Sequence, residues 1–178
     1  EFLYTKIEKQ LRFMIDNNLD ACFSNQKVYD EISGKLLYEK KYTNYSNDFT
    51  NKQILIYHLT DMIVGTQTFM YRKSVLDEID GFDIVPTGHE YVLMYKTIMN
   101  DFKVGHLDEA LVKIYKHNDE RISTSKKKLR GELYLYNIKK RHFHEMTFKE
   151  RKKVKYQFRV NCYRFYKNRK SLKQFVYF

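Results

Sequence analysis

The chain has 178 residues, of which 43% are hydrophobic and 31% charged, a composition that supports a folded domain and excludes disorder as a description of the whole. Six glycines, one proline and two cysteines exclude collagen-like, linker-rich and disulfide-framework classes, and no apolar run approaches the roughly 20 residues of a membrane span. The net charge of +11 is uneven, since residues 126–178 hold 18 Lys and Arg against 3 Asp and Glu, and residues 1–125 hold 15 against 19. We therefore expect a near-neutral body and a basic extension that contacts an anionic partner.

The start of the chain predicts a helix followed by a hairpin. Apolar residues recur at helical spacing within residues 3–16, and we expect them to face the core: Leu3, Ile7, Leu11 and Met14. Residues 20–30 and 35–41 predict two strands, joined by a turn at Ser33 and Gly34.

A capped helix and a further strand are predicted next. Thr50 and Gln53 have the spacing of a capping box and predict a helix over about residues 51–59. Residues 62–71 combine β-branched and aromatic side chains around Gly65. This pattern predicts a strand whose backbone is kinked or closely approached at the glycine.

Two helices are predicted on either side of a proline-containing loop. Ser74 and Asp77 predict the cap of a short helix that ends at Gly81, where a glycine can adopt the left-handed conformation. A second helix is expected to begin at His89 and Glu90, with its apolar face formed by Tyr91, Met94, Tyr95 and Ile98.

The end of the body predicts two short strands, residues 102–107 and 110–115, and the basic extension predicts helices. Thr147 and Glu150 form a second capping box at the start of a long last helix. One face of that helix carries Val154, Phe158, Cys162 and Phe165. We expect this helix either to lie on an anionic membrane surface or to pack on the body, and both can hold together.

Five stretches of the body occur in an order and spacing that is similar to a known family: Lys6–Gln10, Asp20–Ser24, Gly65–Phe82, Gly88–Tyr91, and Tyr115–His117 with Ile122–Ser123. Together they resemble the C-terminal half of a family-two glycosyltransferase of the GT-A fold, the class that builds bacterial surface polysaccharides from nucleotide sugars. The resemblance covers about residues 1–125. It implies an α/β fold class, a partial GT-A fold with a mixed sheet and flanking helices, to which residues 126–178 add a helical extension.

The resemblance implies that Glu90 is the catalytic base of an inverting sugar transfer, although the family usually has aspartate at this place. Inverting transfer requires one carboxylate that takes the proton of the acceptor hydroxyl. A carboxylate in the first turn of a helix is held by the helix-end amides and the macrodipole. The alternative is that Glu90 only stabilises the start of its helix.

The resemblance also implies a divalent metal, Mn or Mg, on the diphosphate, with His117 as a ligand. The family's Tyr-Arg-x-His is shortened here to Tyr115-Lys116-His117, and His117 also fits a surface histidine at a strand end. Donor or acceptor contacts are expected from Gly65, Arg72, His89 and Arg121. Each has a plainer alternative: close packing for the glycine, solvated turns for the arginines, and a helix cap for His89.

The expected partners are a nucleotide-sugar donor and a glycan or lipid-linked acceptor, in a cytoplasmic protein that is peripheral on the inner face of the membrane. In the family the nucleotide-binding half precedes the helix with which this chain begins, so we expect the chain alone to be inactive. Two other functions stay open. A nucleic-acid-binding module would use the basic extension and the 16 tyrosines, although no nucleic-acid-binding motif is recognised, and a non-catalytic interaction module would bind the acceptor without turnover.

Overall fold

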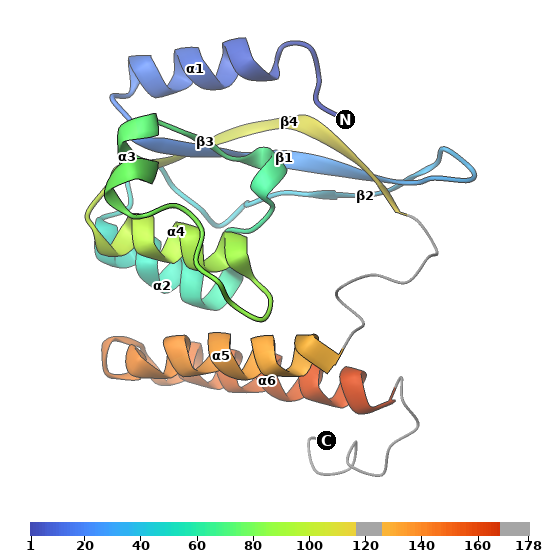
Figure 1. The fold of residues 1–178 in the computed structure, drawn as a ribbon, viewed down its shortest axis with the longest axis vertical. Helices are drawn as coiled ribbons and strands as arrows, with labels where there is room; N and C mark the ends of the chain where they lie inside the picture. Colours follow the sequence, from blue (N-terminus) through green and yellow to red (C-terminus); the bar gives the residue numbers. More distant parts are fainter. Residues whose placement is uncertain (117–125, 168–178) are drawn as a thin grey trace.

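The computed structural model describes residues 1–116 and 126–167 as an α/β fold in layers (Figure 1). The sheet is covered on one face by α1 and on the other by α2 and α4, and α5 and α6 form a further layer beyond these two helices. In chain order the elements are α1 (Lys6–Asp16), β1 (Ala21–Asp30), β2 (Leu36–Lys40), α2 (Asn51–Asp61), the 3-10 helix η1 (Thr66–Thr68), β3 (Met70–Tyr71), α3 (Lys73–Glu78), α4 (His89–Met99), β4 (Val104–Lys116), α5 (Lys126–Arg141), the 3-10 helix η3 (Phe143–Glu145) and α6 (Phe148–Lys167).

The sheet is mixed and is organised around β1. β4 runs parallel to β1 over its whole length, from Ala21 opposite Val104 to Asp30 opposite Lys116. The other edge of β1 is shared by two antiparallel partners, β3 at its beginning and β2 at its end. The predicted α/β class with a mixed sheet and flanking helices is therefore confirmed.

The two capping boxes are confirmed in atomic detail. The backbone N–H of Thr50 donates to Gln53 Oε1 at 2.9 Å, and the backbone N–H of Gln53 donates back to Thr50 Oγ1 at 3.4 Å. At the start of α6 the backbone N–H of Thr147 donates to Glu150 Oε2 at 2.7 Å. The expected hairpin of β1 and β2 is also present.

The expected pair of strands before residue 116 is wrong, because β4 is one continuous strand with a bulge. Ser24 pairs with Leu107 and the next residue, Asn25, pairs with Ala110, so that Asp108 and Glu109 have no partner in the register. The Asn25 side chain occupies the bulge and donates from Nδ2 to Asp108 Oδ1 at 2.6 Å. A turn-like dipeptide thus disturbs the strand without ending it.

The strand expected over residues 62–71 is also wrong. Met62 and Gly65 have positive φ angles of 64° and 113°, which break the extended backbone, and only Met70 and Tyr71 form a strand. The predicted cap of the next helix is wrong as well, since Arg72 occupies the N-cap position of α3 without a side-chain capping bond.

The apolar face predicted for α1 is rotated in the structure. Ile7 and Leu11 are 57% and 51% exposed, whereas Lys6 and Gln10 are buried against the sheet. Gln10 donates from Nε2 to the carbonyl of Thr68 at 2.8 Å, and Lys6 Nζ lies 3.5 Å from the carbonyl of Phe69. These two carbonyls belong to residues 62–69, which do not form a strand. The side chains of Lys6 and Gln10 therefore supply the hydrogen-bond donors that the backbone of a neighbouring strand would otherwise supply.

The helices α5 and α6 share a hydrophobic core with the body. One cluster of buried residues extends from Phe23 on the sheet to Leu135 on α5 and Val154 on α6. A Cβ atom on Gly131 of α5 would lie 1.7 Å from Thr87 Oγ1 and 3.2 Å from the Thr87 backbone nitrogen. The glycine therefore allows α5 to approach the loop that leads into α4.

We predict that Gly131→Ala lowers the free energy of unfolding by about 1–3 kcal/mol, because the new methyl group overlaps Thr87. On a solvent-facing helix position the same substitution would stabilise by about 1 kcal/mol. Urea denaturation of the variant measures the sign, with Asn137→Ala at an exposed position of α5 as the control. A stabilised Gly131→Ala protein would contradict this packing.

Candidate functional site

Glu90 lies at the start of α4. Gly88 occupies the N-cap with φ of 84°, and a Cβ atom there would lie 2.9 Å from Leu135 Cδ1. Glu90 follows in the first turn, half-buried, near the positive end of the helix dipole. The exposed His89 pairs locally instead, with its Nδ1 2.9 Å from the carbonyl of Asp83. This contact fits the helix-start alternative for His89.

Lys40, at the end of β2, brings a cation to the same place. Burial lowers the pKa of Lys40 to about 8, and the negative charge of Glu90 opposes that shift. Its ammonium group donates to the carbonyl of Val64 at 3.4 Å and lies 5.0 Å from the centre of the Tyr42 ring. Lys40 could not be identified from the sequence, since a lysine near the end of a hairpin strand carries no distinguishing pattern.

Gly65 lies beside these groups, next to the carbonyl that Lys40 contacts. A Cβ atom on Gly65 would lie 3.2 Å from Gln26 Oε1 and 3.3 Å from Gln67 Nε2, two atoms that are hydrogen-bonded to each other at 2.9 Å. This close approach agrees with the packing alternative for the glycine. The structure thus gathers Glu90, Lys40 and the turn at Gly65 between β2 and the start of α4.

Arg72 lies elsewhere, at the opposite end of β1. Its Nε donates to the carbonyl of Leu19 at 2.9 Å, and the same atom lies 3.9 Å from an Asp20 carboxylate oxygen. Gly65 packs against Gln26, whereas β3, which leads into Arg72, pairs with β1 at Cys22. Gln26 and Cys22 are four residues apart on β1, which corresponds to about 13 Å along the strand. The structure therefore does not bring Arg72 to Glu90. His117 and Arg121 lie outside the described residues.

His58 fixes the first turn of α4 to the end of α2. The imidazole is fully buried and stacks on the Tyr91 ring with 4.1 Å between ring centres. The backbone N–H of Ile63 donates to Nδ1 at 3.2 Å, so the proton is on Nε2, which donates to the carbonyl of Tyr91 at 3.0 Å. Burial lowers the pKa of His58 to about 3, and the ring is neutral at ordinary pH.

The side chains of the described residues do not form a metal site by themselves. Within residues 1–116 and 126–167, no three His, Cys, Asp or Glu side chains converge in a way that could hold an ion. An ion beside Glu90 would need further ligands, and we derive no chemical step through a metal.

No protein-family model, curated protein or solved structure matches the chain. The fold and the geometry around Glu90 therefore carry the functional argument. In the part of the chain that the structure describes, no helix is long and apolar enough to cross a bilayer.

We predict that His58 makes the protein acid-sensitive. Its folded-state pKa of about 3 lies below the ordinary value of 6.5, so the unfolded chain binds a proton first as the pH falls. The stabilisation is complete above about pH 6.5 and is lost toward pH 3, with a slope of up to about 1.4 kcal/mol per pH unit. Urea denaturation across this range should show a shallower slope for His58→Gln. The exposed-site variant His144→Gln should keep the full slope, and an unchanged slope in His58→Gln would contradict the assignment.

Proposed function

We propose that this chain is the acceptor-side part of an inverting, family-two glycosyltransferase of the GT-A fold. The reaction would transfer a sugar from a nucleoside diphosphate donor to a glycan or lipid-linked acceptor, in the synthesis of cell-surface polysaccharide. The resemblance of residues 1–125 motivates the proposal. The observation that carries it is the half-buried carboxylate of Glu90, held in the first turn of α4, whose negative charge acts on the half-buried ammonium group of Lys40.

Glu90 is the general base in this proposal. The acceptor hydroxyl oxygen attacks the anomeric carbon, its proton passes to a Glu90 carboxylate oxygen, and the bond to the diphosphate breaks with its electron pair leaving on the diphosphate. Anchoring by His58 and by Gly88 supports this role, because a base must be held within hydrogen-bond reach of the hydroxyl. A divalent metal and His117 stay part of the proposal, and the metal would neutralise charge on the departing diphosphate.

The outer face of α1 supports the proposal that a donor-binding part packs on this domain. Ile7, Leu11 and Ile15 lie at helical spacing on α1 and are exposed, as is Tyr4 just before the helix, while the opposite face of α1 already covers the sheet. A continuous apolar stripe is unusual on a solvated helix and is typical of a surface covered by another packed element. In a GT-A enzyme, a nucleotide-binding half would supply such an element.

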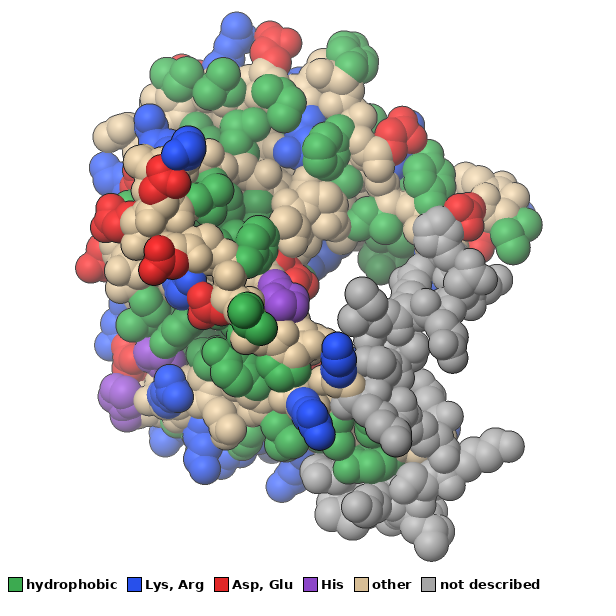
Figure 2. All heavy atoms as spheres, in the orientation of Figure 1, with side chains coloured by type: hydrophobic (Ala, Val, Ile, Leu, Met, Phe, Trp, Pro, Cys, Tyr) green, Lys and Arg blue, Asp and Glu red, His purple; other side chains and the backbone are tan. Residues whose placement is uncertain are grey.

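The cations on the outer face of α6 support the proposal that the protein binds to an anionic membrane surface. Figure 2 shows lysine and arginine side chains gathered over α5 and α6, whereas charges of both signs mix over the body. Along α6, four cations and one tyrosine lie on the side away from Val154: Lys149, Lys152, Arg159, Tyr163 and Lys167. Cations with interfacial aromatic rings suit anionic headgroups.

We predict that Glu90→Gln reduces sugar transfer at least a thousandfold, because the amide cannot accept the acceptor proton. Donor binding should change by less than twofold, since the base contacts the acceptor hydroxyl. The assay measures nucleoside diphosphate release by the protein as encoded in its gene, including any sequence before Glu1. Glu78→Gln on α3 is the charge-matched control, and retained turnover in Glu90→Gln would refute the assignment.

Replacing Lys149, Lys152 and Arg159 together by glutamine should weaken binding to phosphatidylserine-containing vesicles about a hundredfold. Each cation near the surface contributes about 1 kcal/mol, so three contribute about 3 kcal/mol. Vesicle co-sedimentation at low and at physiological salt measures the loss, with Lys35, Lys41 and Lys103 replaced together as the charge-matched control. Unchanged vesicle binding, or a loss confined to duplex DNA, would overturn the membrane role.

A further inference from the structure

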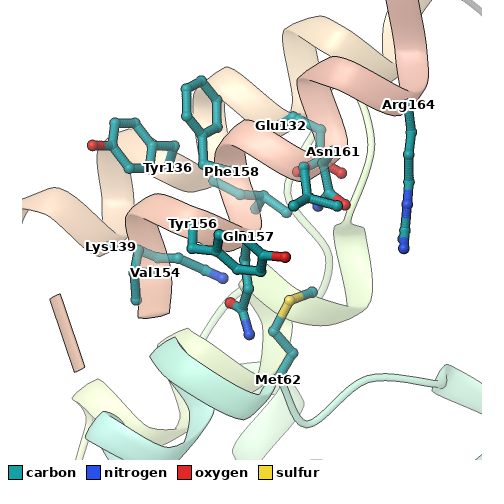
Figure 3. A pocket seen from close by; sticks show the side chains of 12 residues that line it. Met62, Glu132, Tyr136, Lys139, Val154, Tyr156, Gln157, Phe158, Asn161 and Arg164 are labelled. Atoms are coloured by element: carbon teal, nitrogen blue, oxygen red, sulfur yellow. Dashed lines mark hydrogen bonds between the residues drawn. The ribbon is translucent and has the colours of Figure 1, made fainter. Parts of the chain in front are cut away.

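A cavity of about 370 Å³ lies between α5, α6 and the end of α2, and Glu90 does not line it. Figure 3 shows the side chains that surround it, with Lys139 on one side, Arg164 on the other and Met62 below. The volume is in the range of sites for small ligands. Leu135 lines the cavity and also packs on Gly88, so the cavity adjoins the start of α4.

Lys139 is a buried cation that lines this cavity, and no described residue accepts a hydrogen bond from it. The residue is 7% exposed, and its ammonium nitrogen lies over the face of the Tyr91 ring, 5.4 Å from the ring centre. Among the described residues, neither a hydrogen bond nor an ion pair is made by this ammonium group. Burial lowers the pKa of Lys139 to about 8, against the opposing charges of Glu132 and Asp61. An ammonium group in this position retains its full capacity to donate to a ligand.

Gln157 adds the complementary group. Its Nε2 donates to the carbonyl of Thr60 at 2.8 Å, which directs the amide, and its Oε1 is buried without a donor within the described part of the chain. The cavity therefore offers Lys139 as an unused donor and Gln157 as an unused acceptor. A hydroxyl group satisfies both kinds of partner, because it donates and accepts.

The remaining walls fit a saccharide. Tyr136, Tyr156 and Phe158 line the cavity with aromatic surface. Tyr136 and Phe158 stack on each other with 4.2 Å between ring centres, and Tyr156 is 67% exposed. Aromatic faces pack against the apolar C–H face of a sugar ring, while hydroxyl groups reach the polar side chains. The cations Lys139 and Arg164 outnumber the single carboxylate, Glu132, which is already bonded by Asn161 at 3.0 Å. The charge balance favours a ligand with a negative group.

We propose that this cavity binds one saccharide unit that carries an acidic group. The acidic group contacts Lys139, a ring hydroxyl donates to Gln157, and Arg164 contacts the ligand at the other side of the cavity. The site is separate from Glu90 and does not rest on the proposed transfer reaction. Its test requires no turnover, so its failure and the failure of the transferase proposal are distinguishable.

Isothermal titration calorimetry with glucose 6-phosphate, glucose and inorganic phosphate tests the site. We expect glucose 6-phosphate to bind at least tenfold more tightly than either fragment, because it alone satisfies both the cation and the hydroxyl acceptor. Lys139→Met should weaken it about tenfold, in line with one lost charged hydrogen bond, and Arg164→Gln should weaken it less. Lys140→Met, which removes the neighbouring exposed lysine, should bind as the unaltered protein does.

The melting temperature gives an independent control for folding. Lys139→Met removes a buried cation that has no acceptor in the described part of the chain, so we expect this variant to melt at the same or a higher temperature than the unaltered protein. A well-folded Lys139→Met protein with unchanged affinity for glucose 6-phosphate would overturn the proposal. Equal affinity for inorganic phosphate and glucose 6-phosphate, or no heat of binding at millimolar glucose 6-phosphate, would also overturn it.

Discussion

The hydrogen bond from His58 Nε2 to the carbonyl of Tyr91 is the contact on which the geometry around Glu90 depends. It joins the end of α2 to the first turn of α4, and the same ring accepts from the backbone of Ile63, where the chain turns toward Gly65. On the other side, α5 packs against Gly88 and Thr87. Because the first turn of α4 is held from both sides, Glu90 has a fixed position relative to Lys40.

This arrangement makes α5 and α6 part of the structure of the site. Their buried residues belong to the same core as those of the sheet, and Gly131 and Leu135 contact the two residues before α4. The same helices also turn a row of cations outward. In the account proposed here, one helical layer thus supports the catalytic carboxylate and orients the domain on an anionic surface.

The elements that could be predicted from the sequence are those whose determinants lie within a few residues. Thr50 with Gln53 and Thr147 with Glu150 complete their hydrogen bonds inside one turn, so spacing alone identifies them. The buried face of α1 could not be predicted this way. Lys6 and Gln10 are buried because their side chains contact backbone carbonyls that lie some 60 residues later in the chain. A period-based rule assigns such polar side chains to solvent.

In the candidate site, too, the residues that could be predicted depend on local sequence and the others depend on distant contacts. Glu90 could be located because a helix start and its first-turn carboxylate are local features. Lys40 and Lys139 could not, since their unusual environments arise only when β2 meets Val64 and when α5 meets Tyr91. Arg72 was expected at the site from the family resemblance, and its hydrogen bond to the carbonyl of Leu19 places it at the beginning of β1 instead.

Turnover of a panel of nucleotide sugars with Mn²⁺ or Mg²⁺ tests the central claim most directly. Residues 1–178 are compared with the protein as encoded in its gene, including any sequence before Glu1 (the extended protein). The account predicts nucleoside diphosphate release by the extended protein and none by residues 1–178 alone, because the donor-binding part is proposed to pack on the exposed face of α1. Neither release nor binding of any nucleotide sugar by the extended protein would contradict the assignment of a glycosyltransferase.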